Sequence, residues 1–558
     1  MITGGKLVVN TLERKGVKYI FTLSGGHIAA IYEHLIGSSI KVIDTRHEQA
    51  AVFMAEAYAR LTGEVGVALV TAGPGLTNAV TGIANARLAH SPILLLSGRI
   101  GLKSEERLDL QEIEQLNVVS PLVKWSKLVS LPERIPEFID TAMRHARSGS
   151  PGPTFIDMPV DILGKEVPES SVRFLDTPPL SKPAGNQEEI KTAVEMLSRA
   201  KRPIIIAGSG ALYSRAHDEV RDLVEKTGIP LFTLSMGRGI LPETHPLAFG
   251  PALVIRPGAA GSALTTADVV MLLGTRINLF TMFGNIFSAD AKIIQVNIDQ
   301  TEIGRNRNVA LGIVGDVGVV SKQLTQSLSG AIEKNRFSEW ADELRKQARF
   351  SLDSVMDATS SDKIPIHPQR LMKEIDEFIG EDGIVVADGG DTQVWMGMMR
   401  TSHHFGQYLD SGLLGCLGVG IPFANTAKLI FPQKRVLLVI GDGSLGFNFM
   451  ELHTAVRHKL PIVVVVSNDL GWGMIRHSQT LKFGAGKNIA TELGSVDYHR
   501  MIEVLGGYGE MVTNPADIKG ALDRAFKSGK VSLINVFTDP DIISPGSYAL
   551  ASIAASAY

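Results

Sequence analysis

The sequence predicts an α/β protein built from three doubly wound parallel-sheet domains. Short β-rich runs alternate with helical patterns almost throughout the 558 residues. These runs are continuously apolar rather than alternating, which is typical of parallel strands covered by helices on both faces. Most of them end in Gly, Asn or Asp, and ligands gather at such strand ends in folds of this class. Clear examples begin at Val65, Pro92, Arg202, Asp268, Lys292, Arg435 and Pro461.

Two polar stretches rich in Pro and Ser divide the chain, one starting at Val167 and the other at Leu352. Both are predicted as linkers. They delimit an N-terminal domain at 1–166, a central domain at 185–345 and a C-terminal domain at 365–540. The tail at 541–558 is weakly polar and nearly uncharged, so we expect it to be either disordered or a lid over a site.

The composition narrows the class of protein. The net charge of -3 gives no indication of a nucleic-acid or anionic-membrane partner. A single cysteine, Cys416, excludes an internal disulfide framework and a cysteine-based zinc site. The first residues lack the apolar core of a signal peptide, and the longest apolar runs are too short to span a bilayer. We therefore expect a soluble, cytoplasmic protein.

Two acids follow neighbouring strands in the C-terminal domain. Asp442 stands in "VIGDGSLGF" and Asp469 in "VVSNDLGWG", about 27 residues apart, an interval that fits one strand-helix-strand unit. Two carboxylates and a backbone carbonyl could supply half of an octahedral Mg²⁺ shell, with diphosphate oxygens and water completing it. Gly441 and Gly443 would let the backbone approach those oxygens, and Ser444 would donate to them.

This "GDGS…ND" pattern resembles the metal-diphosphate motif of thiamine-diphosphate enzymes. The resemblance covers nearly the whole chain. "VIDTRHEQAA" and "VGVALVTAGPGLTNAVTGIANA" are similar to the first domain of the acetolactate synthase, benzaldehyde lyase and 2-hydroxyacyl-CoA lyase group, and "VVMLLGTRINLF" is similar to its central domain. The resemblance implies pyrimidine-binding, central and diphosphate-binding domains, with thiamine diphosphate and Mg²⁺ as cofactors.

The metal motif departs from the family at one position. Where the family usually has Asn-Asn, this chain has Asn468-Asp469, so a carboxylate replaces an amide oxygen as the expected ligand. That change keeps an oxygen ligand and adds a negative charge, which is compatible with Mg²⁺. The expected metal ligands are Asp442, Asp469 and the backbone carbonyl of Gly471.

Glu48 lies in "VIDTRHEQAAVFMAEAYARLTG", at the start of a helix that we expect to be largely buried. From residue types alone, a buried acid paired with Arg46 or His47 is the simpler interpretation. The resemblance implies another role, because a glutamate at this position contacts the aminopyrimidine ring and promotes deprotonation of the thiazolium carbon. In the family this glutamate and the diphosphate site belong to different subunits, which implies a homodimer at least and a homotetramer typically.

Further cofactor contacts carry over by motif. Gly415 matches the backbone position beside the pyrimidine amine, and Leu417 matches the apolar residue that bends the cofactor; an ordinary core leucine is the alternative. Met474 is expected to line the substrate side. The other expected contacts are Pro74 and Asn78 near the pyrimidine, Gly390, Asp391 and Thr392 at the diphosphate, and Gly473 near the cofactor.

Two residues bear on the substrate. His27, in "LSGGHIAAI", occupies a place where benzaldehyde lyase and some 2-hydroxyacyl-CoA lyases carry histidine, and its pKa range suits proton transfer. Gln111, in "LDLQEIEQ", resembles the glutamine that faces the substrate in many family members. A helix-terminal histidine and a polar loop residue are the alternatives without a chemical role. Ile475 replaces the glutamate of pyruvate decarboxylases, which disfavours a simple decarboxylase.

The segment "GTRINLFTMFG" resembles the part of 2-hydroxyacyl-CoA lyases and oxalyl-CoA decarboxylases that binds an adenine nucleotide or CoA. The resemblance therefore favours cleavage of 2-hydroxyacyl-CoA to an aldehyde or ketone plus formyl-CoA, with ADP or CoA in the central domain. An acetolactate synthase, which would need FAD and condense 2-keto acids, and a benzaldehyde lyase-type acyloin cleavage are the alternatives. A protein that kept the fold without catalysis is disfavoured by the joint presence of Glu48, Asp442 and Asp469.

Overall fold

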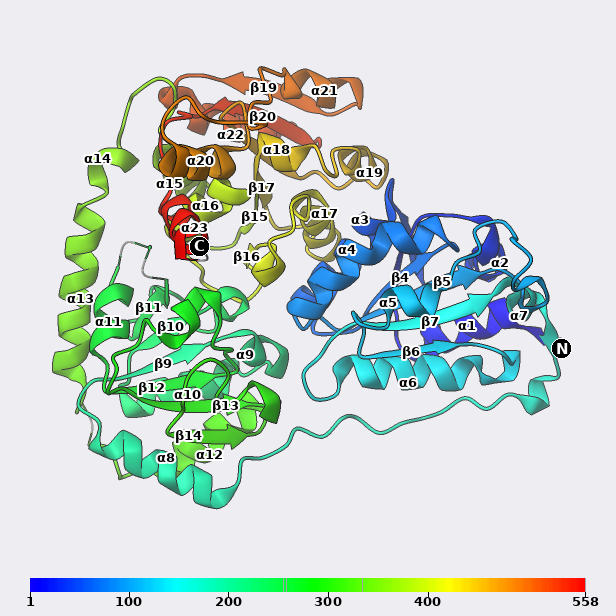
Figure 1. Ribbon diagram of the computed structural model, residues 1–558, viewed down its shortest axis with the longest axis horizontal. Coiled ribbons are helices and arrows are strands. Elements are labelled where there is room, and N and C mark those ends of the chain that lie inside the picture. The colour runs from blue at the N-terminus through cyan, green and yellow to red at the C-terminus, as the bar shows by residue number, and fades with distance from the viewer. Residues whose placement is uncertain (254, 257, 334, 557–558) are drawn as a thin grey trace. The chain divides into compact units, whose positions relative to one another are not determined.

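The computed structural model describes residues 1–556 except 254, 257 and 334. The described chain forms two compact units. One comprises residues 1–181, 411–432 and 448–460, and the other comprises residues 182–410, 433–447 and 461–558. The elements of both units are labelled in Figure 1.

A six-stranded, wholly parallel sheet forms the core of the N-terminal domain, with strand order β3-β2-β4-β5-β7-β6. Its strands are β2 (Tyr19–Thr22), β3 (Lys41–Asp44), β4 (Gly66–Val70), β5 (Ile93–Arg99), β6 (Trp125–Leu128) and β7 (Thr154–Pro159). Its helices are α1 (Gly4–Arg14), α2 (Ala29–Leu35), α3 (Glu48–Thr62), α4 (Pro74–Leu88), α5 (Gln115–Val119), α6 (Ile135–Arg147) and α7 (Val160–Gly164). A short antiparallel pair joins β1 (Ile2–Thr3) to β8 (Glu166–Val167).

Apolar residues point to both faces of this sheet, as the continuous apolar runs predict. In β4, Val67 and Leu69 pack into a cluster with α1, α2 and α6, whereas Ala68 and Val70 pack into a second cluster with α3, α4 and α5. Side chains of a strand alternate between faces, so a strand covered on both faces must be apolar at every position. α17 (Gly420–Ile430) packs against α3 within the same unit.

The central domain has a second parallel sheet, of order β11-β10-β9-β12-β13-β14. Its strands are β9 (Pro203–Ala207), β10 (Leu231–Thr233), β11 (Ala248–Pro251), β12 (Val269–Leu273), β13 (Lys292–Asn297) and β14 (Leu311–Val314). Its helices are α8 (Gln187–Arg199), α9 (Ser209–Ser214), α10 (His217–Thr227), α11 (Ala260–Thr266), α12 (Val317–Leu328) and α13 (Ser338–Asp353). α8, α10 and α12 cover one face, and α11 and α13 cover the other.

The C-terminal domain has a third parallel sheet, of order β16-β15-β17-β18-β20-β19. Its strands are β15 (Ile384–Asp388), β16 (Tyr408–Leu409), β17 (Val436–Gly441), β18 (Val463–Asn468), β19 (Tyr508–Val512) and β20 (Ser532–Phe537). Its helices are α15 (Pro368–Ile379), α16 (Gly390–Met399), α18 (Asp442–Leu445), α20 (Gly473–Phe483), α21 (Tyr498–Val504), α22 (Ile518–Lys527) and α23 (Pro545–Ser556), whereas α19 (Glu451–Arg457) belongs to the first unit. The predicted α/β class with three parallel sheets is confirmed.

Two predicted irregular stretches contain helices. The predicted end of the central domain, residue 345, lies inside α13, whose Trp340 and Leu344 are buried in a core cluster of that domain. The stretch that follows contains α14 (Met356–Thr359). In the tail, α23, which is red in Figure 1, packs against α16 and α20. Ser544 and Ser547, at the start of this helix, are buried.

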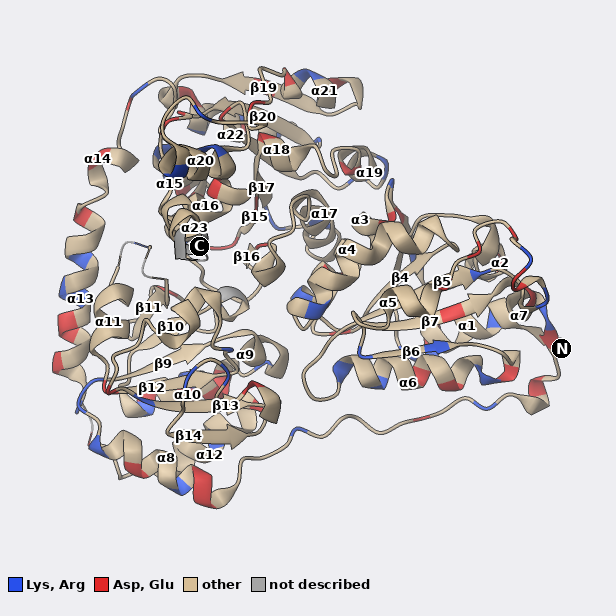
Figure 2. Ribbon diagram, viewed as in Figure 1, with Lys and Arg blue, Asp and Glu red and all other residues tan. Residues whose placement is uncertain are grey.

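Surface charge is mixed in sign. Figure 2 shows acidic and basic residues interspersed along α13. Within the described part of the chain, no helix combines the length and the apolar character needed to cross a membrane.

Candidate functional site

Glu48 is the first residue of α3 and is 6% exposed. Its Oε2 accepts a hydrogen bond of 3.0 Å from Nδ2 of Asn78, which lies in the second turn of α4. The side chains of Arg46 and His47 are engaged elsewhere, with the ring of His453 and with the backbone N–H of Gln49. The interpretation that pairs Glu48 with Arg46 or His47 is therefore wrong, and the carboxyl group faces the first turns of α4.

The start of α4 is shaped by a glycine. Gly73 precedes Pro74 with a φ of +57°, a backbone conformation that L side chains rarely adopt. A Cβ atom on Gly73 would lie 2.7 Å from the carbonyl oxygen of Gln111. Gln111 is itself in a left-handed conformation, with a φ of +68°. The predicted substrate residue Gln111 and the predicted pyrimidine contact Pro74 are thus brought together.

His27 lies in a short 3-10 helix, η1 (Gly26–Ile28), after the carboxyl end of β2. It is half-buried, and its Nδ1 is 3.4 Å from Oγ1 of Thr71, two residues before Gly73. The structure therefore places His27, Gln111 and Glu48 around one region at the carboxyl edge of the N-terminal sheet.

Asp442 and Asp469 follow the adjacent strands β17 and β18, which pair through Gly441 and Ser467. Asp442 is buried, and its Oδ2 has no hydrogen-bond donor among the described residues. Burial and the neighbouring Asp469 raise the pKa of Asp442 to about 8. Two carboxyl groups held this closely, one with a free buried oxygen, form a site suited to a divalent cation.

The positive charge beside this pair comes from Arg476, whose Nη2 lies 2.8 Å from Oδ2 of Asp469. Burial raises the pKa of Asp469, and Arg476 opposes that effect. Arg476 therefore offsets part of the charge that Asp469 adds relative to the Asn-Asn usual in the family. Over the described residues, no three His, Cys, Asp or Glu side chains are grouped as a metal site.

Glycines let protein atoms pack closely around the backbone at this edge of the sheet. A Cβ on Gly473 would lie 2.1 Å from Oδ2 of Asp469, and one on Gly443 would lie 2.6 Å from the ring of Trp472. A Cβ on Gly441 would lie 3.3 Å from the hydroxyl oxygen of Thr392. Side chains on Gly473 and Gly443 would collide with Asp469 and Trp472, so this packing requires glycine.

Helices α16 and α20 begin at this edge, so their N-terminal amides are available to an anion. Gly390 opens α16 and would carry its Cβ 2.7 Å from that of Met474, in the first turn of α20. Ser444 donates to Oδ1 of Asp388 at 2.8 Å, so its hydroxyl is engaged within the protein.

The carboxylate of Asp391 lies beside this edge, with Oδ2 3.5 Å from the position of a Cβ on Gly473, and it is engaged by the tail. Its Oδ1 accepts from Ser547 at 2.8 Å and from Ser544, and its Oδ2 lies 2.7 Å from Nδ1 of His477. The carboxylate therefore ties α23 to α16. The buried hydroxyl groups of Ser544 and Ser547 hold the start of the tail in place. The first turns of the tail are therefore helical rather than disordered.

Gly415 and Leu417 follow the 3-10 helix η8 (Gly412–Leu414). Gly415 is exposed with a φ of +70°, and Leu417 is half-buried. Gly471 is buried and pairs in a single antiparallel bridge with Glu492.

Several polar residues around these sites were not singled out from the sequence. Glu451, in α19, is buried and accepts a 2.9 Å hydrogen bond from the backbone N–H of Arg46, two residues before Glu48. Gln115 accepts from the N–H of Gly73 at 2.7 Å. Asp388 ends a buried apolar strand just as Asp442 follows one, and that signal could have identified it.

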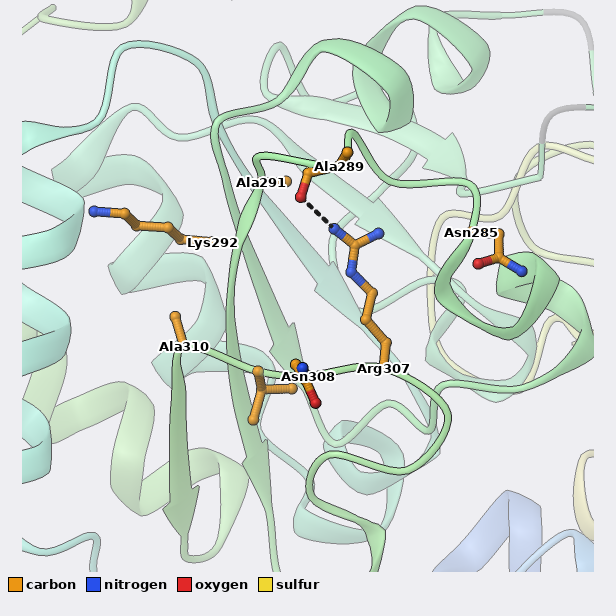
Figure 3. A pocket seen from close by; sticks show the side chains of 8 residues that line it. Asn285, Ala289, Ala291, Lys292, Arg307, Asn308 and Ala310 are labelled. Atoms are coloured by element: carbon orange, nitrogen blue, oxygen red, sulfur yellow. Dashed lines mark hydrogen bonds between the residues drawn. The ribbon is translucent and has the colours of Figure 1, made fainter.

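The central domain contains a cavity of about 480 Å³ (Figure 3). It lies at the amino ends of β13 and β14, where Lys292 and Ala310 stand, whereas ligands of such sheets gather at the carboxyl ends. Arg307 lines it and donates to the backbone carbonyls of Gly284 and Phe287, so its guanidinium group serves the fold. The cavity borders the segment expected to bind a nucleotide, residues 274–284, because its lining residue Asn285 directly follows that segment and Arg307 donates to the carbonyl of Gly284.

Comparison with known proteins identifies the class. Family models match in all three domains: "thiamine pyrophosphate enzyme, N-terminal TPP binding domain" at residues 2–118, "central domain" at 190–324 and "C-terminal TPP binding domain" at 388–536. This chain belongs to the thiamine pyrophosphate enzyme family, and it is an enzyme with TPP-binding domains.

Relatives of two activities are similar to the chain to the same degree. A probable acetolactate synthase of Mycobacterium bovis is 35% identical over 97% of this chain and 96% of its own length. The 2-hydroxyacyl-CoA lyase 2 of Danio rerio is 35% identical over 96% of this chain and 91% of its own, and that of Homo sapiens is 36% identical over 91% and 85%.

Proposed function

We propose that this enzyme is a thiamine-diphosphate-dependent carbon-carbon lyase that cleaves 2-hydroxyacyl-CoA to an aldehyde or ketone plus formyl-CoA. The observation that carries the proposal is the position of His27, half-buried at the carboxyl edge of the N-terminal sheet beside Thr71 and the Gly73 turn. An imidazole there could exchange a proton with a substrate hydroxyl. Full-length similarity to 2-hydroxyacyl-CoA lyase 2 supports the same reaction.

The roles of the N-terminal residues follow from their chemistry. Bound thiamine diphosphate supplies a nucleophilic carbon and an electron sink for the cleavage. Glu48 holds a proton at the aminopyrimidine ring, and Asn78 orients its carboxyl group through the 3.0 Å hydrogen bond. His27 moves a proton at the substrate hydroxyl, and Gln111 holds the substrate carbonyl or hydroxyl oxygen.

The C-terminal residues hold the diphosphate and Mg²⁺. Asp442, Asp469 and the carbonyl of Gly471 bind the metal, a role that the unpartnered Oδ2 of Asp442 supports. The backbone around Gly441 and Gly443 and the first turn of α16 bind the diphosphate; Asp391 contributes through its backbone only, since its carboxylate is engaged. Gly415, Leu417, Gly473 and Met474 complete the cofactor contacts.

Mg²⁺ affinity is expected to rise with pH. Because the pKa of Asp442 is raised to about 8, the pair holds a proton at neutral pH that Mg²⁺ must displace. Affinity should increase about tenfold per pH unit below that pKa and level off above it. This pH dependence is checked by titrating Mg²⁺ into the enzyme with thiamine diphosphate at pH 6.5, 7.5 and 8.5. Calorimetry in two buffers measures the proton released on binding.

Asp469→Asn supplies the control for the metal experiment. It removes the second carboxylate and restores the Asn-Asn usual in the family, so the pKa of Asp442 should fall toward the value set by burial and the affinity should level off at a lower pH. An unchanged pH profile in this variant would show that Asp469 does not contribute to the raised pKa of Asp442.

The reaction itself is tested by product analysis. Purified enzyme with thiamine diphosphate and Mg²⁺ is given 2-hydroxyacyl-CoA, pyruvate and benzoin in parallel. We expect formyl-CoA and an aldehyde or ketone from the first substrate at the highest kcat/KM. Acetolactate from pyruvate as the dominant product would replace the proposal with the second candidate.

Acetolactate synthesis is that second candidate because the Mycobacterium bovis relative is equally similar and covers the chain as completely. A yellow, FAD-containing preparation would favour it. In the lyase proposal, ADP or CoA binds the central domain near η6 (Leu279–Gly284), which follows the carboxyl end of β12 and exposes about half of Met282 and Phe283.

We also propose that the active form is a homodimer or homotetramer in which Glu48 and the diphosphate site come from different subunits.

The tail helix α23 packs on α16 and α20. We propose that it is a lid over the edge of the sheet that binds the diphosphate.

A further inference from the structure

The amide of Gln115 is a buried junction in the N-terminal domain. Gln115 opens α5 and is 1% exposed. Its Oε1 accepts the N–H of Gly73 at 2.7 Å, and its Nε2 donates to Oδ1 of Asp157 at 2.6 Å and to the carbonyl of Gly98 at 2.9 Å. The backbone N–H of Gly73 can only donate a hydrogen bond, whereas the carboxylate of Asp157 and the carbonyl of Gly98 can only accept one. These three partners therefore determine which way the side-chain amide of Gln115 points.

One side of this junction reaches the region of Gln111. Gly73, whose N–H Gln115 accepts, has no room for a side chain because the backbone of Gln111 packs on it. Any shift of the Gly73 turn must therefore move Gln111 as well, since close-packed groups transmit displacements. The other side reaches His27, because a Cβ on Gly98 would lie 2.7 Å from Cβ of His27.

The segment that carries Gln111, residues 102–114, is tied down by Arg99. Arg99 donates to Glu105 at 3.0 Å and lies 4.0 Å from Glu114, one residue before Gln115. Asp157, which is fully buried, accepts from both Arg99 and Gln115.

The tip of the same segment has no comparable apolar attachment. Leu108 is 97% exposed and Leu110 is 75% exposed. The exposed tip is therefore held through the polar ties at the ends of the segment and through Leu102, which packs against a core cluster of the domain.

We propose that Gln115 is a positioning residue for the reaction: it sets the spacing between His27 and Gln111 and thereby the fit of the substrate at the cofactor. This inference rests on the proposed function, in which His27 and Gln111 face the substrate. Gln115 itself touches neither substrate nor cofactor. A displacement of about 1 Å in a group that orients a substrate can cost as much as ~100-fold in rate.

Gln115→Leu tests the proposal, because leucine has a similar size but no hydrogen-bonding groups. We expect kcat with 2-hydroxyacyl-CoA to fall about 10- to 100-fold, and the affinity for thiamine diphosphate and Mg²⁺ to change by less than about threefold. Hydrogen–deuterium exchange should become faster in peptides from 102–114. Equal kcat and KM in the variant and the wild type would overturn the proposal.

Gln407→Leu is the matched control. Gln407 is also 1% exposed, and it accepts the backbone N–H groups of His403 and His404 in the C-terminal domain. Its loss should lower the melting temperature without changing kcat per folded molecule or exchange at 102–114. If Gln115→Leu and Gln407→Leu lost kcat equally, general destabilisation would explain the effect at Gln115 and the proposal would be overturned.

A reciprocal swap gives the conservative rescue. In Gln115→Glu, the new carboxylate still accepts from the N–H of Gly73 but faces two acceptors, Asp157 and the carbonyl of Gly98. Adding Asp157→Asn restores a donor opposite an acceptor at one of these two contacts, so the double variant should recover part of the kcat lost in Gln115→Glu alone. No recovery would contradict the role of this contact. If the wild type lacks lyase activity, the proposed function fails, whereas the exchange measurement still reports on whether Gln115 holds the segment.

Discussion

Replacing Glu48 by Gln is expected to lower kcat by about 100-fold or more while the protein stays folded. Glutamine has nearly the same shape, and its amide oxygen can still accept from Asn78 as Oε2 of Glu48 does at 3.0 Å. What it cannot do is exchange a proton with the aminopyrimidine ring. The measurements are kcat at saturating cofactor and the dissociation constant of thiamine diphosphate by fluorescence. A kcat equal to that of the wild type would refute the assigned role of Glu48.

Glu56→Gln is the matched control for this prediction. Glu56 is a second buried acid on α3, fully covered and paired with Arg60 in the next turn. Removing its charge weakens the buried ion pair with Arg60, so stability should fall, but kcat per folded molecule should not. Equal losses of kcat in the two variants would mean that disturbance of α3 explains the effect.

Mixing two inactive variants tests where the partner of Glu48 lies. If Glu48 and Asp442 act from different subunits, mixed oligomers of Glu48→Gln and Asp442→Ala contain sites in which both residues are native. Activity should then return after subunit exchange. No activity in demonstrated mixed oligomers would place both residues of a site in one subunit.

Glu243→Gln is expected to reduce stability by about 3–5 kcal/mol, because it removes one partner from a buried ion cluster. Glu243 is 3.0 Å from both Arg238 and Arg256, and its side chain is 4% exposed. Burial opposes ionisation of Glu243, but the two guanidinium groups outweigh it and lower the pKa of this carboxyl. Both arginines also donate to the carbonyl of Arg400, which follows α16. Urea midpoints and melting temperatures of the apo and cofactor-loaded enzyme measure the loss.

An exposed ion pair of the same domain provides the control. Glu343 pairs with Arg202 at 3.4 Å, with both side chains about half exposed. Glu343→Gln should change stability by less than about 0.5 kcal/mol, because solvent already screens this pair. A similarly small effect of Glu243→Gln would show that the cluster contributes no more than a surface pair.

In the central domain, the sequence pattern predicted the strands, but the extent of the last helix depends on its tertiary contacts. Its apolar runs located β9, β12 and β13 correctly because a strand buried on both faces must be apolar at every position. The central domain was predicted to end at residue 345 and a linker to begin at Leu352, yet α13 continues to Asp353. Its buried face repeats at helical spacing, but only the sheet against which Trp340 packs shows that this face has a partner.

At the candidate site, the sequence by itself determined the parts that depend on strand order and residue type. Asp442 and Asp469 each follow a buried strand one unit apart, and parallel pairing then brings them to one edge. Only the tertiary structure decided which groups these and other polar side chains meet: Asn78 for Glu48, Arg476 for Asp469, and Gly73 with Asp157 for Gln115. The physical reason is that a buried polar atom bonds to whatever donor or acceptor packing places within about 3 Å of it, and that neighbour can come from any distance along the chain.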